Sequence, residues 1–218
     1  MRNILVVVAH QDDEALGCGG TLAKHISNGD RVKVVFVSDG YSSRDDGENR
    51  DYAAIDYAKL LKLEKPIFLD YKNNRMDSVD LLDIIKKIER IVEEYKPEVV
   101  YTHHYGDLNI DHQVTHRATI TACRPQPGFS VKEIYSFEVL SSTGWQSKSM
   151  GPGFDPSYYV DISNFFHIKV SSLKIYDDEM RNYPHSRSYQ AVESLAKYRG
   201  SSIGVKYAEA FQVERCIV

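Results

Sequence analysis

The stretch Ile4-Leu5-Val6-Val7-Val8-Ala9-His10-Gln11-Asp12-Asp13-Glu14 decides the fold class and contains the first candidate site. Its apolar, mostly β-branched run is typical of a strand that is buried on both faces of a parallel sheet. The run ends at a histidine, and residues 13–28 are predicted to form a helix. The polar side chains therefore lie at the carboxyl end of a central strand, where open α/β sheets bind their ligands. One imidazole beside several carboxylates at that edge indicates a metal site that serves hydrolysis.

Strands and helices alternate through the first half of the chain. Strands are predicted at 3–8, 32–38, 66–70 and 98–102, and helices at 13–28, 48–63 and 78–95. In the third helix, apolar residues such as Ile84, Ile88 and Ile91 recur with helical spacing, and Lys and Glu occupy the other side. Repeated β-α-β units predict an α/β fold with a Rossmann-like, mostly parallel sheet flanked by helices.

The second half of the chain has a looser pattern. A helix is predicted at 111–122, strands at 131–140, 158–162 and 210–215, and further helices at 167–182 and 188–199. A loop rich in Ser, Gly and Pro spans 141–156 and is long enough to serve as a lid. We therefore expect residues 1–218 to form a single domain with an elaborated C-terminal part.

Composition excludes several classes of protein. Lys and Arg number 27 against 31 Asp and Glu, so the net charge of −4 does not indicate a nucleic-acid binder. The three cysteines (Cys18, Cys123 and Cys216) lack CxxC spacing, which disfavours a disulfide framework and fits a reducing cytoplasm. The first apolar run is too short for a signal sequence or a membrane span. We expect a cytoplasmic protein without membrane insertion, and homo-oligomer formation stays open.

The candidate metal ligands come from two segments. His10 and Asp13, three residues apart at a strand-to-helix turn, can converge on one ion, and Asp12 points differently and can accept a proton from water. A catalytic zinc site uses three protein ligands. The segment 102–112 follows another central strand, so His112 can supply the third ligand, with Asp111 and Asn109 behind it or facing substrate.

Three further histidines are weaker candidates. His116 stands four residues after His112, a spacing seen in helical zinc pairs, but we expect it to have a structural role. His103 and His104 are reserve ligands. Glu14 is expected only to favour the positive end of the helix that follows the first strand.

Several motifs resemble the LmbE/PIG-L family of zinc-dependent deacetylases. His10-Gln11-Asp12-Asp13-Glu14 looks like the family's AHPDDE motif, and the segment 106–112 is similar to its second motif, which ends in Asp-His. The pair is highly specific. Weaker similarities extend over nearly all of the chain: Asn74-Arg75-Met76-Asp77, Glu138-Val139-Leu140-Ser141-Ser142-Thr143, Pro184-His185-Ser186-Arg187-Ser188, Tyr198-Arg199-Gly200 and Ala208-Glu209-Ala210-Phe211.

The resemblance implies a set of roles. His10, Asp13 and His112 would bind Zn²⁺, although Fe²⁺ or Co²⁺ also suits such ligands, and Asp12 would be the general base. The substrate would be a small N-acetyl sugar (a glycoside, a sugar nucleotide or a related glycoconjugate), with release of acetate. Arg44 resembles a substrate-binding arginine of the family, and Asp77 is a candidate ligand for a sugar hydroxyl.

The sequence departs from the family pattern at two positions. Gln11 stands where proline is usual, which we expect only to loosen the turn. Asn109 stands where many members have a histidine that stabilises the oxyanion or protonates the amine. An asparagine amide can donate to an oxyanion but cannot deliver a proton. Either Asp12 returns the proton or another acid helps; His185 is the candidate for that acid, and a structural role is the alternative for this histidine. We predict that loss of His185 slows the reaction more than loss of Asn109.

Three alternatives remain. The same metal chemistry can cleave another small amide conjugate. An inactive family member can serve as a sugar-binding protein, an interpretation that only Asn109 favours. A nucleotide-binding Rossmann protein would use Gly17-Cys18-Gly19-Gly20 as a phosphate loop, but these glycines lie inside the predicted helix instead of directly after the strand. We expect them to allow close packing of the helix on the sheet.

Overall fold

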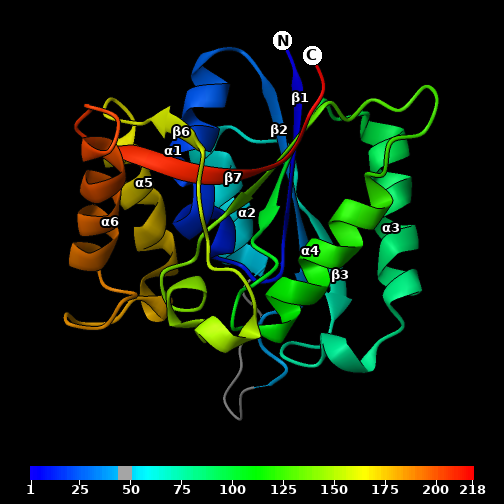
Figure 1. Ribbon diagram of the computed structural model, residues 1–218, viewed down its shortest axis with the longest axis horizontal. Coiled ribbons are helices and arrows are strands. Elements are labelled where there is room, and N and C mark those ends of the chain that lie inside the picture. Colours follow the sequence, from blue (N-terminus) through cyan, green and yellow to red (C-terminus); the bar gives the residue numbers. More distant parts are fainter. Residues whose placement is uncertain (44–50) are drawn as a thin grey trace.

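A seven-stranded sheet, in the order β3-β2-β1-β4-β5-β7-β6, runs through the described part of the molecule (Figure 1). The computed structural model describes residues 1–43 and 51–218. The first five strands along the chain pair in parallel, whereas β7 is antiparallel to both β5 and β6. The prediction of a mostly parallel α/β sheet is confirmed. The strands are β1 (Asn3–Val8), β2 (Arg31–Ser38), β3 (Ile67–Tyr71), β4 (Val99–His103), β5 (Glu133–Phe137), β6 (Tyr158–Asp161) and β7 (Ala208–Cys216).

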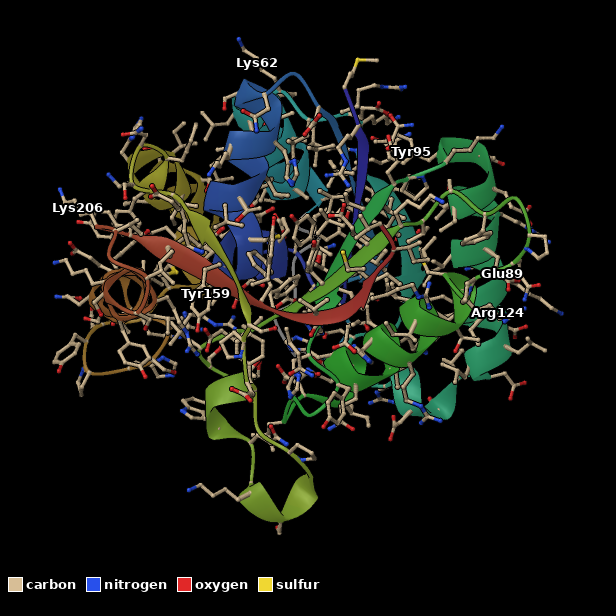
Figure 2. All side chains as sticks on the ribbon, turned by 45° about the horizontal axis from the view of Figure 1, so that its top comes forward. Lys62, Glu89, Tyr95, Arg124, Tyr159 and Lys206 are labelled. Carbon is tan, nitrogen blue, oxygen red and sulfur yellow. The ribbon has the colours of Figure 1, made fainter. Side chains whose placement is uncertain are left out.

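Helices cover both faces of the sheet. One face carries α3 and α4, and the other carries α1, α2, α5 and α6 (Figure 1). On the first face, Glu89 of α3 pairs with Arg124, just beyond α4, at 3.0 Å (Figure 2). The helices are α1 (Asp13–Ser27), α2 (Asp51–Leu61), α3 (Leu81–Tyr95), α4 (Ile110–Ala122), α5 (Phe166–Leu173) and α6 (Tyr189–Ser201). None of the helices in the described residues is both long and apolar enough to cross a membrane.

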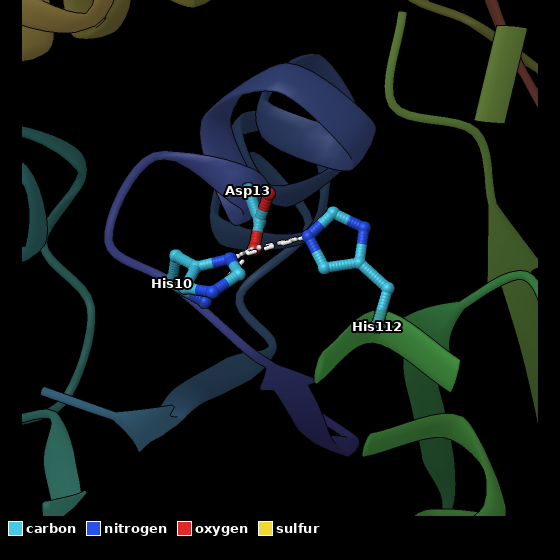
Figure 3. A group of neighbouring side chains, drawn as sticks. All are labelled: His10, Asp13 and His112. Atoms are coloured by element: carbon cyan, nitrogen blue, oxygen red, sulfur yellow. Dashed lines mark hydrogen bonds and ion pairs between the residues drawn. The ribbon is translucent and has the colours of Figure 1, made fainter. Parts of the chain in front are cut away.

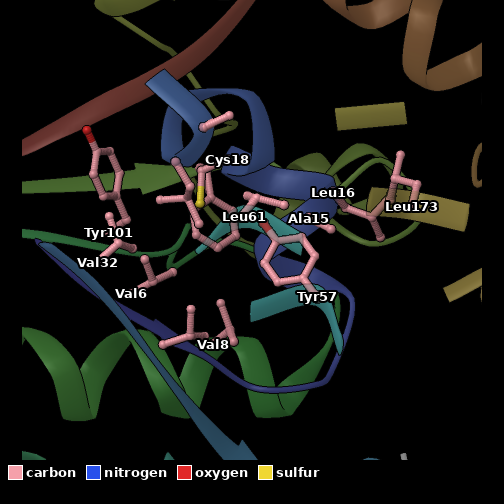
Figure 4. Close-up of a cluster of buried hydrophobic side chains, with 14 of the residues drawn as sticks. Val6, Val8, Ala15, Leu16, Cys18, Val32, Tyr57, Leu61, Tyr101 and Leu173 are labelled. Atoms are coloured by element: carbon pink, nitrogen blue, oxygen red, sulfur yellow. The ribbon is translucent and has the colours of Figure 1, made fainter. Parts of the chain in front are cut away.

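Strand β1 lies in the core and contributes to both faces. Val6 and Val8 belong to the cluster under α1 and α2 (Figure 4), whereas Leu5 and Val7 belong to the cluster under α3 and α4. All four side chains are fully buried. A strand that is apolar at every position has no solvent-facing side, which is why its sequence shows a continuous run and no alternation.

The glycines of α1 serve packing, as expected. A Cβ atom on Gly17 would lie 2.2 Å from Cδ2 of Phe137, a fully buried ring on β5. A Cβ atom on Gly20 would lie 2.8 Å from Cδ1 of Ile162. The absence of side chains at these positions lets α1 approach the sheet closely.

Helix α1 is kinked at Cys18, whose φ of −142° is not helical. In a regular helix the carbonyl of Leu16 would accept from the N–H of Gly20. Here the Nζ of Lys169 donates to Leu16 O at 2.7 Å, and Gly20 N donates to Oε1 of Glu209 at 3.0 Å. Lys169 and Glu209 also pair with each other at 2.5 Å, and both are buried. The kink is therefore occupied by a buried ion pair whose members satisfy the backbone groups of α1.

Two predicted elements differ clearly from the structure. The strand predicted at 131–140 is only Glu133–Phe137, because the chain turns where Thr143 N donates to Val139 O. The helix predicted at 167–182 ends as α5 at Leu173 and continues as a 3₁₀ segment, Lys174–Glu179, with non-helical angles at Tyr176. That tyrosine is held by a hydrogen bond to Glu14. The start predicted for the second helix, at 48, lies outside the described residues.

The order of the strands positions the site. From β1 the chain moves to β2 and β3 on one side, and it then returns to place β4 on the other side of β1. The carboxyl ends of β1 and β4 thus flank a point where the strand order reverses, which is where open α/β sheets bind ligands. The segments that begin at His10 and His104 both leave the sheet there.

Candidate metal centre and polar pocket

The turn between β1 and α1 folds back on itself. His10 N donates to Oδ2 of Asp13 at 2.8 Å, and Asp13 N lies 3.4 Å from His10 O. Asp12 precedes α1 with φ 129° and ψ −25°, which is a strained backbone conformation for a residue with a side chain. The tight turn directs the side chains of Asp12 and Asp13 differently, as the sequence suggests.

His10, Asp13 and His112 come together at the ends of β1 and β4 (Figure 3). His10 Nδ1 lies 3.2 Å from Asp13 Oδ2 and 3.2 Å from His112 Nε2. His112 Nε2 lies 3.3 Å from the same oxygen of Asp13. The three candidate ligand atoms thus form a nearly equilateral triangle, built from the two segments that the sequence singled out.

A carboxylate orients each imidazole of the triangle. The Nε2 atom of His10 lies 3.1 Å from Oδ2 of Asp111, and the Nδ1 atom of His112 lies 3.1 Å from Oδ2 of Asp107. Both aspartates are fully buried. Asp111 is itself fixed by backbone N–H groups of Asn74 and Met76. A carboxylate behind a histidine fixes its tautomer and leaves the other ring nitrogen free for a metal.

The three groups also shift one another's pKa. Burial works against charge on both histidines, but hydrogen bonds from Asp111 and Asp13 raise the pKa of His10 to about 9. Asp13 and Asp107 raise the pKa of His112 to about 10 in the same way. Burial would raise the pKa of Asp13, yet the charge of His112 and hydrogen bonds from His10 and His103 hold it well below its usual value. Three buried carboxylates, those of Asp13, Asp107 and Asp111, thus surround the two imidazoles.

The triangle has the dimensions of a metal site. Tetrahedral zinc with ligands at about 2.0–2.1 Å separates its ligand atoms by about 3.3–3.4 Å, and the three separations here are 3.2, 3.2 and 3.3 Å. The other carboxylate oxygen of Asp13, Oδ1, is buried and has no hydrogen-bond partner in the described structure. The residues present therefore fit a divalent metal ion.

The remaining histidines near the site lie outside the triangle, and Nε2 of His103 is 3.4 Å from Oδ2 of Asp13. His103 stacks on His112 with ring centroids 3.8 Å apart, and its Nε2 accepts from Ala9 N at 2.9 Å. Burial and the charge of His112 lower the pKa of His103 to about 4, so it is neutral. His116 Nδ1 bonds to the carbonyl of His103 at 2.8 Å, which agrees with a structural role. His104 is buried against the rings of Tyr105 and Phe154.

Asp12 lies beside the triangle and is held by an arginine. Arg187 Nη1 donates to Oδ2 of Asp12 at 2.9 Å, and Nε of the same arginine donates to Ser141 Oγ at 2.9 Å. Arg187 also lies 3.4 Å from Glu179. Burial raises the pKa of Asp12, and the charge of Arg187 only partly offsets this effect. A carboxylate whose pKa is shifted towards neutrality is suited to accept a proton.

Glu14 is a buried hydrogen-bonding residue. Its Oε1 accepts from the hydroxyl of Tyr176 at 2.6 Å, and its Oε2 accepts from Asp12 N at 3.2 Å. Burial raises the pKa of Glu14 to about 8. Glu14 thus supports the turn that carries Asp12, a role that the sequence did not indicate.

A pocket of about 90 Å³ opens beside these groups. Its lining residues in the described part of the chain are polar or glycine: His10, Gln11, Asp12, Gly40, Asn73, Asn74, Asn109, Glu179 and Arg187. Gln11 does not loosen the turn, contrary to expectation. Its buried Nε2 donates to Asp39 O and to Oδ1 of Asp51, which ties the turn to the start of α2. A Cβ atom on Gly40 would lie 2.0 Å from Oε1 of Gln11, so a side chain at position 40 would displace this glutamine.

The other predicted site residues have different locations. Asn109 lines the pocket; its Oδ1 accepts from Asp111 N as the N-cap of α4, and its Nδ2 donates to Asn74 Oδ1 at 3.3 Å. His185 is absent from the described lining of the pocket; its Nδ1 accepts from Arg187 N at 3.0 Å. Asp77 is exposed on a short 3₁₀ segment, Met76–Ser78, outside that lining. Arg44 lies outside the described residues.

Two residues of the site were missed in the sequence. Asp107 lies in the quoted segment that ends at His112, but no periodic pattern indicates that it reaches His112. Arg187 lies in the Pro-His-Ser-Arg segment, in which the sequence indicated His185 as the candidate residue instead. The pairing of Arg187 with Asp12, which is distant in sequence, is visible only after folding.

Comparison with known proteins gives matches over most of the chain. The "Uncharacterized deacetylase YaiS" of Escherichia coli is 29% identical over 79% of this chain and 89% of its own length. The diacetylchitobiose deacetylase of Thermococcus kodakarensis is 21% identical over 97% of this chain and 83% of its own length. Among solved structures, GalB, the 4-carboxy-2-hydroxymuconate hydratase of Pseudomonas putida, superposes with a TM-score of 0.79 at 21% identity, covering 100% of this chain and 98% of its own.

The hydratase shows that this fold supports more than one reaction, so the family must be decided by sequence and by the site. The model of the family described as "PIG-L: GlcNAc-PI de-N-acetylase" matches residues 5–123, which include His10, Asp12, Asp13 and His112. This match covers more than half of the chain, and the protein therefore belongs to the PIG-L family.

Proposed function

We propose that this PIG-L family member removes the acetyl group from N-acetylated amino sugars in a metal-dependent hydrolysis. One observation carries the proposal: a metal-sized triangle of His10, Asp13 and His112 shares a polar pocket with the buried carboxylate of Asp12. The curated relatives add support, because those with known substrates are named as deacetylases of such sugars.

His10, Asp13 and His112 would hold the metal. Two nitrogens and one carboxylate oxygen suit Zn²⁺, and Fe²⁺ or Co²⁺ also accepts this set. A divalent metal bound there acidifies a water molecule and polarises the acetyl carbonyl. Asp107 and Asp111 keep both imidazoles oriented, so the protein contributes a preorganised site.

Asp12 would act as the general base. Its carboxylate lines the pocket, and the contact with Arg187 fixes its Oδ2 atom at one side. The other oxygen, Oδ1, is then the one that takes the proton from the attacking water. Asp12 is separate from the three candidate ligands, so its replacement leaves the metal site intact.

Asn109 would donate to the oxyanion of the tetrahedral intermediate. Its amide carries two N–H groups, and one of them goes to Asn74. Since Asn109 cannot supply a proton, Asp12 returns the proton it accepted to the leaving amine. The alternative, in which His185 protonates the amine, is tested below by a pair of variants.

Sugar hydroxyls would bind to the polar rim of the pocket. Asn73 and Asn74 supply amide groups there. Arg44 and Asp77 stay as proposed contacts for the substrate. We also propose a cytoplasmic location, because the three cysteines are free in the structure, as in a reducing compartment.

The reading as an inactive sugar-binding protein is less well supported. It explains Asn109, but it leaves the strained Asp12 and the three converging ligands without a purpose. Cleavage of another small amide would use the same groups, and a substrate screen separates it from sugar deacetylation.

The test is an acetate-release assay with N-acetylglucosamine, N,N′-diacetylchitobiose and UDP-N-acetylglucosamine, with and without a chelator. We expect release that the chelator abolishes and that added Zn²⁺ restores. Asp12→Asn should keep its metal and lose about 10²–10⁴-fold in kcat, whereas His112→Ala should lose both metal and activity. Near-normal turnover by Asp12→Asn would overturn the assignment of the base.

A further inference from the structure

We infer that Trp145, braced by His185, is a stacking platform for a saccharide unit next to the N-acetylated sugar. This inference rests on the proposed function and names a residue that selects its substrate. It predicts that the enzyme prefers a disaccharide or longer glycoside to the free monosaccharide.

The position of Trp145 is fixed relative to the metal site. It ends a short 3₁₀ turn, Thr143–Trp145, in a segment that projects beyond the sheet (Figure 2). Trp145 N donates to Ser142 O at 3.1 Å, and Ser142 Oγ lies 3.3 Å from Nδ1 of His112. Ser141, the preceding residue, accepts from Nε of Arg187, which lines the pocket. Trp145 thus follows directly on residues that contact the candidate ligand His112 and the pocket residue Arg187.

Hydrogen bonds hold this turn in place. The hydroxyls of Ser142 and Thr143 both donate to Oδ2 of Asp107, at 3.0 and 2.6 Å. Gln146, which follows Trp145, packs so closely on Gly106 that a Cβ atom there would lie 2.6 Å from its Nε2. The carboxylate that orients His112 therefore also anchors the turn that carries Trp145.

His185 braces the indole from the other side. The two rings meet edge to face, with centroids 5.5 Å apart and planes at 77°. His185 Nδ1 accepts from Arg187 N, and Arg187 contacts the proposed base Asp12. Even with this support, Trp145 is 53% exposed. A large aromatic side chain that is held in place and still open to solvent is available to a ligand.

The size of the pocket places most of the substrate outside it. Its volume of about 90 Å³ is well below the ~300–1,000 Å³ of sites that enclose a whole ligand. The acetamide group fits, and the sugar ring and its aglycone must rest on the rim. A pyranose ring presents C–H groups on its faces and hydroxyls at its edge, so it suits an aromatic surface beside a polar pocket.

The described cation of the pocket is already paired. Among the described residues that line the pocket, the cationic side chain is Arg187, and it contacts Asp12 and Glu179. A neutral second sugar needs no cation from these residues, whereas a diphosphate would depend on Arg44, which lies outside the described residues.

The test compares the substrates with Trp145→Ala and Trp145→Phe. For Trp145→Ala we expect kcat/KM with N,N′-diacetylchitobiose to fall about threefold to tenfold through KM, since a stacking contact is lost. The value with N-acetylglucosamine should change less than twofold, and Trp145→Phe should recover most of the loss. An equal loss with both substrates, or no loss, overturns the proposal. A larger loss with UDP-N-acetylglucosamine would show that Trp145 stacks on the uracil ring instead of a sugar, which also overturns the proposal.

Tyr198→Ala is the matched control, because Tyr198 is another exposed aromatic residue, at 62%, on α6. It should leave the ratio of the two kcat/KM values unchanged. A change as large as that of Trp145→Ala would show that the effect is not local.

Fluorescence separates this inference from the proposed reaction. Trp145 is the single tryptophan of the chain, so its emission reports on this position alone. With metal-loaded Asp12→Asn protein, N,N′-diacetylchitobiose should shift or quench the emission saturably, and N-acetylglucosamine should have a weaker effect. If no substrate releases acetate, the proposed function fails. The titration still decides the role of Trp145, because the absence of a saturable change with the disaccharide refutes the stacking platform.

Discussion

Replacing Lys169 by methionine should destabilise the protein strongly, because it breaks the buried ion pair at the kink of α1. The variant leaves the carboxylate of Glu209 buried at 5% exposure without its counter-charge, although Gly20 N and Thr21 N still donate to it. It also removes the donor to Leu16 O. Loss of one partner of a buried pair costs about 3–5 kcal/mol.

The double variant Lys169→Met/Glu209→Gln should recover part of this loss. The neutral glutamine removes the uncompensated charge, and its Oε1 can still accept one backbone N–H of α1. What remains is the loss of individual hydrogen bonds, at about 1–3 kcal/mol. The double variant should therefore be about 2 kcal/mol more stable than Lys169→Met alone.

Urea unfolding followed by circular dichroism measures these differences, and thermal melts provide a second readout. For a domain of this size each kcal/mol shifts Tm by about 2–4 °C, so Lys169→Met should melt about 10 °C below the natural protein. If the double variant is no more stable than Lys169→Met, the buried charge is not the main cost and the reasoning is refuted.

Three further outcomes are expected. The affinity of the apoprotein for metal should rise by up to about 100-fold per pH unit between about pH 7 and pH 9. His10 and His112, whose pKa values are raised to about 9 and about 10, must each lose a proton before the metal binds. A competition titration with a chelator measures this affinity, and a result without pH dependence would contradict the expectation. Asn109→Ser keeps an N-cap acceptor for α4. It should slow deacetylation more than His185→Ala does, because Asn109 lines the pocket. This order is the reverse of the one expected from the sequence, and kinetics with the purified variants decide between the two. Gly17→Ala should lower the free energy of unfolding by about 1–3 kcal/mol in urea, since its methyl group meets a core ring, and an unchanged midpoint would show that the helix can move away.

The sequence by itself determined the elements whose cause is local. The continuous apolar run at 4–9 predicted β1 with its observed bounds, and the apolar spacing of 78–95 predicted α3 to within three residues at its start. The two short motifs also indicated His10, Asp13 and His112, which the structure brings together. These features depend on side chains that are neighbours in the chain or that follow parallel strands to one edge of the sheet.

Only the tertiary structure decided the contacts made across long sequence separations. The pairing of Arg187 with Asp12, the insertion of Lys169 and Glu209 into the kink of α1, and the bracing of Trp145 by His185 join residues that no periodic pattern links. The burial of partners from distant segments creates these contacts, and that burial depends on how α5, α6 and the loops pack against the sheet. For this reason the candidate metal ligands could be predicted from the sequence, whereas the groups that contact Asp12 and shape the rim of the pocket could not.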